Sequence, residues 1–401
     1  MTMSSSVAQP AAGRSGSAAR RRAVNPFMGL IDAVIVHSPV EFAFDGAIAS
    51  DDAAAVWTWM VRDLAPDLID MDALDRSDRA REAVESLMPE LLARAKKALT
   101  DAETSVEISR RIQTQLGGED EWTRLPVVLN ALRCRGLLDK AQGFGRAANA
   151  MPDEAQLALA LQSMPLSDAP VASLLMMATV GQVAVPSRLI TAAIRIAGAA
   201  SEASLARTGF APLIDAMLAH AQNQIPLLGQ KGTFADMDLV CRAVDRFHRL
   251  MRAVTGYVEL SRAGRWATIA AALTKTVSER LDPKLRDVGP DLNKALRRRD
   301  GVDRLDSDQI LSALNGIYLL ATIRDSRDSL ALNTLFDQVW SQTGQALEIH
   351  IERLMQFVRN DPTDRIASAR LDAALKMAEV RFNQEYADTL RRAKEAAERR
   401  A

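Results

Sequence analysis

Cysteine and aromatic residues are scarce in this chain of 401 residues, and each shortage excludes a class of structure. The two cysteines, Cys134 and Cys241, are too few for a disulfide framework, so we expect free thiols in a reducing, cytoplasmic setting. Aromatic residues make up 4% of the chain, whereas Ala and Leu, which favour helices over strands, are abundant. The composition therefore predicts an all-α protein.

Long apolar runs are missing as well. No window of 18 apolar residues occurs, so we expect no transmembrane segment. Residues 1–22 are rich in Ser, Ala and Arg and contain no acidic residue. The apolar stretch that follows is interrupted by Asp32, which does not fit a secretory signal. We expect a disordered tail over residues 1–24, although an organellar transit peptide or an uncleaved bacterial export signal would share this composition.

Motifs that carry chemistry are also lacking. The four histidines lack the Glu-x-x-His and His-Glu-x-x-His spacings of helical metal sites, and Asp245 with His248 comes nearest. The glycines Gly143 and Gly145 imitate a dinucleotide-binding loop, but residues 129–138 before them predict a helix where that motif requires a strand. We expect no metal and no cofactor, and no catalytic residue can be named.

A helical pattern between residues 236 and 281 is the clearest feature present. Its apolar positions alternate steps of three and four, which places them on one stripe of a helix. A second series begins at Trp266 and continues to Leu281, and we expect Asp282 and Pro283 to end it. The pattern predicts two long helices folded against each other. The first stripe consists of Met237, Val240, Val244, Phe247, Met251, Val254 and Val258.

The distribution of prolines divides the chain. Seven prolines separate short helical runs between residues 119 and 226, whereas none occurs between Pro290 and Pro362. Two runs that open at Pro152 and Pro186 start 34 residues apart, as in stacked helix hairpins. Known repeat signatures do not fit them, so the region is either α-solenoid-like or irregular. We predict an acidic helical region over 25–118, proline-punctuated helical hairpins over 119–226, and an antiparallel long-helix bundle over 227–401.

Caps and prolines predict where several helices begin and end. We expect a short helix between Pro26 and Pro39. We expect no convincing strand, and residues 30–36 are the best candidate for a strand. Glycines at 117 and 118 should end another helix. We expect one last helix to start at Pro362, with the residues beyond Leu390 projecting into solvent.

Charge is segregated along the chain although the net charge is only −1. Residues 32–90 carry 14 acidic and 4 basic side chains, whereas residues 242–304 carry 8 acidic and 15 basic ones. Either the two segments neutralise each other or one faces a charged partner. The arginines form two groups that could bind a partner: Arg242, Arg246, Arg249 and Arg252, and Arg297, Arg298 and Arg299. Interleaved aspartates and the lack of stacking aromatics disfavour nucleic acid or lipid as that partner.

These observations favour a non-catalytic helical scaffold or regulatory protein that binds other proteins. The excess of Arg over Lys, 41 to 9, resembles a bacterial coding bias. An exported helical effector or a gatekeeper of a secretion system is an alternative that the acid-free tail suggests. An α-helical enzyme with a site between the two halves is another, and a deep polar pocket with convergent charges would reveal it. The sequence does not determine the oligomeric state.

Overall fold

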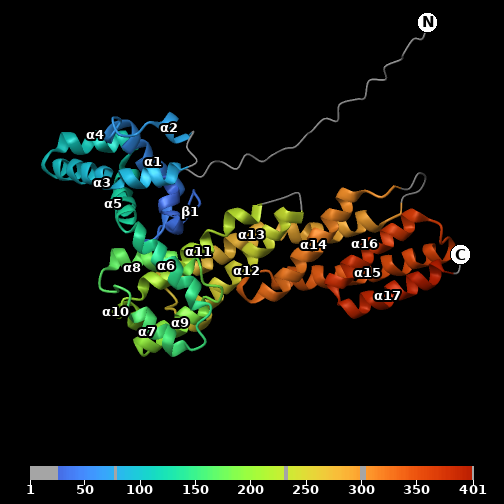
Figure 1. The fold of residues 1–401 in the computed structure, drawn as a ribbon. Helices are drawn as coiled ribbons and strands as arrows, with labels where there is room; N and C mark the ends of the chain where they lie inside the picture. Colours follow the sequence, from blue (N-terminus) through green and yellow to red (C-terminus); the bar gives the residue numbers. More distant parts are fainter. Residues whose placement is uncertain (1–25, 76–78, 230–233, 299–303, 400–401) are drawn as a thin grey trace, which may run out of the picture.

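The computed structural model of the chain describes residues 26–75, 79–229, 234–298 and 304–399. These residues form 17 α-helices, and the expected all-α class is confirmed (Figure 1). None of the helices in these ranges is long and apolar enough to cross a membrane. The predicted tail over residues 1–24 lies outside the described residues.

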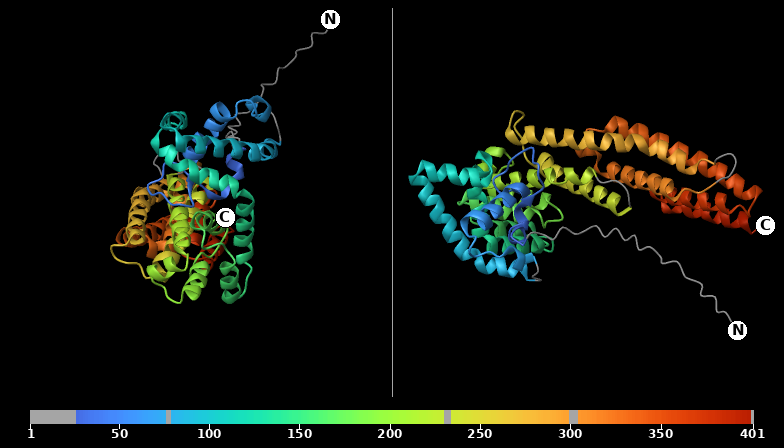
Figure 2. Two further views of the ribbon diagram at one scale, coloured as in Figure 1. Left: turned by 90° about the vertical axis from the view of Figure 1, so that its left-hand side faces the viewer. Right: turned by 90° about the horizontal axis from the view of Figure 1, so that it is seen from above.

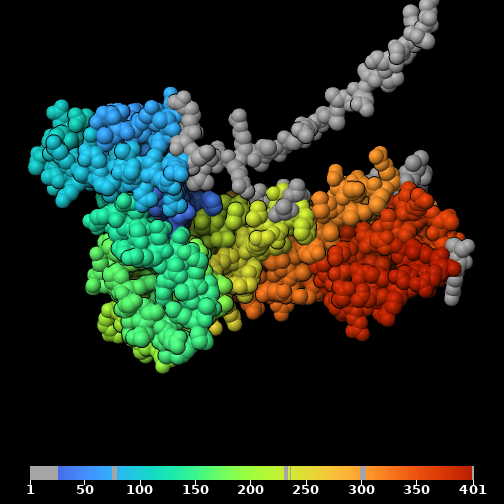
Figure 3. Space-filling view, viewed as in Figure 1, coloured from blue at the N-terminus to red at the C-terminus, as the bar shows by residue number. Residues whose placement is uncertain are grey.

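Helices α1 to α5 form a lobe that stands at one side of the short-helix region (Figure 3). The bounds are α1 Ser50–Trp59, α2 Met71–Asp75, α3 Ala80–Thr104, α4 Val106–Leu116 and α5 Glu119–Arg133. A π-helical turn, Met60–Leu64, follows α1 directly. Gly117 adopts a φ of 119° and ends α4, as the glycine pair predicts.

The prediction of a short helix between Pro26 and Pro39 is wrong. Two 3₁₀ turns, Met28–Leu30 and Asp32–Val34, lead into strand β1, Ile35–Val36. This strand pairs in parallel with β2, Ile48–Ala49. The β-branched side chains at this point suit a strand, and the strand exists only because the chain returns beside it thirteen residues later.

The short-helix region is built around α8, which is buried on all sides. Every residue from Val171 to Val180 is buried, as expected for a helix that is apolar all round. Its main neighbours are α6 and α11 (Figure 1). The bounds are α6 Arg135–Ala148, α7 Glu154–Gln162, α8 Ala169–Val180, α9 Ser187–Ala197, α10 Glu202–Arg207 and α11 Ala211–Gln222. The two helices with starts near Pro152 and Pro186, α7 and α9, pack against each other.

Six longer helices extend to one side of the short-helix region (Figure 2). The bounds are α12 Phe234–Tyr257, α13 Arg265–Leu296, α14 Ser307–Ser326, α15 Asn333–Asn360, α16 Arg365–Arg381 and α17 Gln384–Glu398. Six of the seven apolar residues predicted on the first stripe are buried, and Met237 is partly buried. The two helices of the predicted spine, however, pack less on each other than on α11, α14 and α15.

The predicted end of the second spine helix at Pro283 is wrong, because α13 continues through Pro283 and Pro290 to Leu296. A proline inside a helix costs roughly 3 kcal/mol. Beyond Pro283 the helix buries Leu285, Val288 and Leu292 completely or almost completely, which offsets that cost.

The prediction of a single last helix after Pro362 is also wrong, because two helices, α16 and α17, form there. The chain breaks at Phe382, and the Asn383 side chain caps α17 by accepting a hydrogen bond from the Tyr386 N–H at 2.8 Å. The residues after Leu390 pack back on α16 instead of projecting into solvent. Lys394 is buried there and pairs with a carboxylate of α16.

Candidate functional site

The arginines predicted on α12 lie in different environments. Arg242 and Arg252 are exposed, and Arg242 pairs with Asp238 on its own helix. Arg249 is about half exposed and pairs with Asp245 at 3.0 Å. Arg246 is largely enclosed. Its Nη1 donates to the carbonyl of Val183 at 2.5 Å and its Nη2 to that of Val180 at 2.6 Å.

These contacts of Arg246 lie at the carboxyl-terminal end of α8 and just after it. The last carbonyls of a helix lack intrahelical partners and carry partial negative charge, so a cation is favourable there. His220 contributes from α11, because its Nε2 lies 2.8 Å from the Met177 carbonyl and donates to it. Burial lowers the pKa of Arg246 to about 10 and that of His220 to about 4. At neutral pH the arginine is therefore charged and the histidine neutral.

The second group of arginines lies at the far end of α13. Arg297 is exposed. Arg298 pairs with Asp364 at 3.6 Å and lies over the Phe357 ring at 4.9 Å. These contacts belong to α15 and the start of α16, whereas those of Arg246 lie at the end of α8. Arg299 lies outside the described residues.

His248 and His350 make contacts within the fold. His248 Nδ1 lies 2.9 Å from the Ser329 hydroxyl, and His350 Nε2 lies 2.9 Å from Asn293 Oδ1. Both cysteines are free thiols, and burial raises the pKa of Cys241. In the part of the chain that the structure describes, no three His, Cys, Asp or Glu side chains gather as a metal ion would require.

The acidic and basic segments do not neutralise each other by direct pairing. Acidic residues near the N-terminus pair within their own lobe or with α6, as in Arg94 to Asp67 at 2.5 Å. In the basic segment, Arg265 pairs with Asp215 on α11 at 2.7 Å. Among the described ranges no ion pair joins residues 32–90 to residues 242–298. The charge segregation seen in the sequence therefore persists on the folded molecule.

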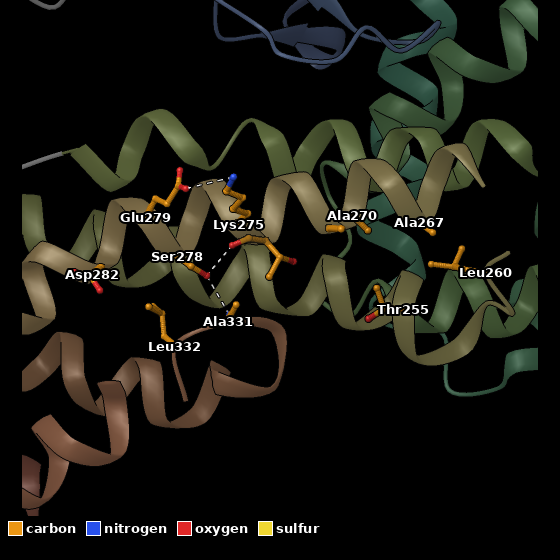
Figure 4. A pocket seen from close by; sticks show the side chains of 12 residues that line it. Thr255, Leu260, Ala267, Ala270, Lys275, Ser278, Glu279, Asp282, Ala331 and Leu332 are labelled. Carbon is orange, nitrogen blue, oxygen red and sulfur yellow. Dashed lines mark hydrogen bonds and ion pairs between the residues drawn. The ribbon is translucent and has the colours of Figure 1, made fainter. Parts of the chain in front are cut away.

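A groove of about 890 Å³ runs along one face of α13, and we call it the α13 groove (Figure 4). Its floor consists of the small side chains Ala267, Ala270, Ala271, Thr274 and Ser278. The end of α12 and the loop after it line the groove near Ala267, and the segment just before α15 lines it near Ser278 (Figure 4). The residues of α13 that line the groove run from Ala267 to Asp282, a stretch of 16 residues and about 22 Å at a rise of 1.5 Å per residue.

The Ser278 hydroxyl and the charged side chains of the α13 groove already have partners within the protein. The Ser278 hydroxyl donates to the Thr274 carbonyl at 2.7 Å and accepts from the Ala331 N–H at 3.1 Å. On the rim Lys275 pairs with Glu279 at 3.8 Å. An active site needs polar groups that converge on a bound atom, and here they converge on each other. What the α13 groove offers to a ligand is an apolar surface.

A second groove, of about 1010 Å³, lies between α3, α5 and the first turn of α8, and we call it the α3–α5 groove. Pro89 and Pro126 lie inside α3 and α5 and line the groove. Its large apolar side chains are Leu92, Leu99, Val127, Leu129 and Leu174.

Sequence reasoning missed the residues that line both grooves, although it predicted the long helices α12 and α13. A signal for the first was the run of small residues at helical spacing from Ala267 to Ser278. For the second it was Leu92 and Leu99, two leucines seven residues apart beside the buried stripe of α3. No protein-family model, curated protein or solved structure matches this chain.

Proposed function

We propose that this protein is a non-catalytic helical scaffold or regulatory protein that acts by binding other proteins. In this proposal an amphipathic α-helix of a partner occupies the α13 groove. The observation that carries the proposal is the combination of an apolar floor with polar groups that are satisfied internally. Such a surface gains free energy by being covered and offers no reactive group.

The dimensions of the α13 groove suit a helix. Packed helices lie 8–10 Å apart, and the short end of that range requires small side chains at the contact. Ala267, Ala270 and Ala271 supply them along the floor. A partner helix of about four turns would match the length of the floor, and its larger apolar residues at positions i, i+3, i+4 and i+7 would fill the volume.

The charges on the rim indicate what kind of contact to expect. Lys275 pairs with Glu279 and Arg286 pairs with Asp282, so both signs are present and already neutralised. We therefore expect binding that depends on apolar contact and changes little with ionic strength. The exposed arginines predicted from the sequence remain a proposed second surface for a partner, and they are Arg242, Arg249, Arg252, Arg297 and Arg298.

A photoreactive amino acid at position 271 tests this proposal in the native host. We expect cross-links to one partner, mapped by mass spectrometry to an amphipathic helical segment. A synthetic peptide of that segment should bind the full chain. Ala271→Arg places a long charged side chain on the floor and should weaken peptide binding at least tenfold.

Ala396→Arg is the matched control, because Ala396 is an exposed alanine on α17 far from the α13 groove in the sequence. Both variants should keep the helical circular dichroism of the parent chain. The proposal is overturned if cross-links fall on no helical segment, or if the two variants bind the peptide equally well.

A further inference from the structure

The α3–α5 groove differs from the α13 groove in its charged residues. Asp45 and Glu103 line it, and neither forms an ion pair with another described residue. The other charged residues of the lining are Lys96, Arg133 and Asp168. Arg133 donates to Asn130 Oδ1 at 2.7 Å, and Asp168 caps α8 through the Val171 N–H at 3.2 Å. Free carboxylates beside an apolar floor are groups that an incoming ligand can pair with.

The surroundings of this groove are strongly acidic. Residues 26–133, which include α1 to α5, carry 20 acidic and 11 basic side chains, a net charge of −9. Arg265 of the basic segment donates to the Ala43 carbonyl at 3.3 Å and lies over the Phe44 ring, but no ion pair between described residues joins that segment to residues 32–90. A cluster of this size attracts cations over a distance of about 10 Å at 0.1 M salt.

We propose that the α3–α5 groove binds a basic amphipathic α-helix of a second partner protein. The apolar face of that helix would cover Leu92, Leu99 and Val127, and its lysines or arginines would reach Asp45 and Glu103. This site is independent of the α13 groove, so one chain can hold two partners at once. The proposal extends the proposed scaffold function and gives it a physical basis.

An anionic amphiphile such as a fatty acid is the main rival ligand, because it could place its carboxylate near Lys96 and Arg133. Charge decides against it. The carboxylate would enter a lobe with a net charge of −9, and two cations offset that field only locally. A basic helix is attracted by the net negative charge of the whole lobe. An acidic side chain on the same helix could still pair with Lys96.

A fluorescein-labelled 18-residue helical peptide with leucines on one face and lysines on the other is a suitable probe. We expect micromolar binding to the full chain at 50 mM salt by fluorescence anisotropy. Binding should weaken at least fivefold at 500 mM salt, because the attraction is electrostatic. The same peptide with glutamates in place of the lysines should bind at least tenfold more weakly, and so should a scrambled peptide without an apolar face.

Two matched pairs of variants locate the binding site. Glu103→Lys should weaken binding about tenfold, whereas Glu107→Lys makes the same change of charge in the same lobe outside the groove and should cost less than threefold. Leu99→Gln should weaken binding at least fivefold. Leu159→Gln, at a leucine that is 70% exposed on α7, should leave binding unchanged.

The proposal would be overturned if the two variants of either pair weakened binding equally. It would also be overturned if the glutamate peptide bound as tightly as the lysine peptide. Displacement of the basic peptide by a long-chain fatty acid, at concentrations below micelle formation, would assign the groove to an anionic amphiphile instead. Ala271→Arg should not change binding of the basic peptide. If the basic peptide fails to bind the α3–α5 groove, the test of the α13 groove is unaffected. If no partner binds the α13 groove, the test with the basic peptide is likewise unaffected.

Discussion

Helices α8 and α13 show two opposite situations within one all-α chain. Neighbouring helices cover α8 on every side, and its carboxyl-terminal carbonyls receive hydrogen bonds from Arg246 and His220. Helix α13 has one uncovered face, where small residues line a groove and the charged residues pair along the helix itself. The comparison shows that the role of a charged side chain depends on whether neighbouring helices cover it. Arg242 and Arg246 stand one turn apart on α12, yet one meets solvent and the other a buried helix end.

The two grooves extend the same comparison to the open surface. The charged side chains beside the α13 groove form ion pairs with each other, whereas Asp45 and Glu103 of the α3–α5 groove can pair with a ligand. We therefore expect the first site to select by shape and the second by shape and charge. The predictions that follow probe the enclosed side of the comparison, where the expected effects on stability are largest.

Arg246→Ala should lower the free energy of unfolding by about 3 kcal/mol. It leaves the Val183 carbonyl, just after α8, without its side-chain donor and removes one of the two donors to the Val180 carbonyl, and a hydrogen bond to a charged group contributes about 1.5–3 kcal/mol. Urea unfolding followed by circular dichroism measures the effect. Arg242→Ala removes an exposed pair and should stay within about 0.5 kcal/mol. Equal losses in the two variants would contradict the distinction drawn on α12.

Acid should destabilise the protein through His220, with a folded-state pKa of about 4 against 6.5 for an ordinary histidine. Between these values the unfolded chain binds a proton that the folded chain does not, so the stabilising contribution is complete above pH 6.5 and falls with pH down to about 4. The shift corresponds to a loss of up to about 3 kcal/mol. Urea unfolding at a series of pH values measures this slope.

His220→Gln isolates this contribution, because a glutamine amide can still donate to the Met177 carbonyl but does not titrate in this range. We expect the variant to lose less stability than the parent chain between pH 6.5 and pH 4. Burial also lowers the pKa of His248 and His350, which act in the same direction in both proteins. Parallel pH profiles for the two proteins would show that His220 is not the responsible group.

Gly145→Ala should destabilise the chain by about 2 kcal/mol through overpacking. A Cβ at this position would lie 2.5 Å from the Thr179 carbonyl oxygen of α8, so the close contact of α6 and α8 requires glycine. Gly143 lies on the same helix with nothing within 4 Å of its Cβ position. Gly143→Ala should therefore stabilise the protein by about 0.5–1 kcal/mol. Thermal unfolding of the two variants should shift in opposite directions, and a shared direction would contradict this packing.

Individual elements show how far sequence reasoning reaches. Gly117 ends α4, as the glycine pair predicts, and six of the seven apolar residues predicted on the first stripe are buried on α12. The failures share a cause, since each concerns an element that depends on distant parts of the chain. Pro283 does not end α13 because the residues after it are buried by α14 and α15. The break at Phe382 allows α17 to fold back on α16.

The candidate sites were less predictable than the fold. Five of the seven arginines predicted to bind a partner are exposed in the structure, but their spacing could not reveal that Arg246 is committed to the end of α8. The residues of the two grooves sit on amphipathic helices, and a one-dimensional pattern does not tell which part of an apolar face stays uncovered.

The sequence by itself determined that this protein is helical, where most of its long helices run, and which stripe of α12 is buried. Those properties follow from local periodicity and capping, which act over one or two turns. Only the tertiary structure decided which faces remain open along α13 and between α3 and α5, and which arginine is enclosed. Those outcomes depend on contacts between residues far apart in the chain, because exposure is a property of the surrounding elements.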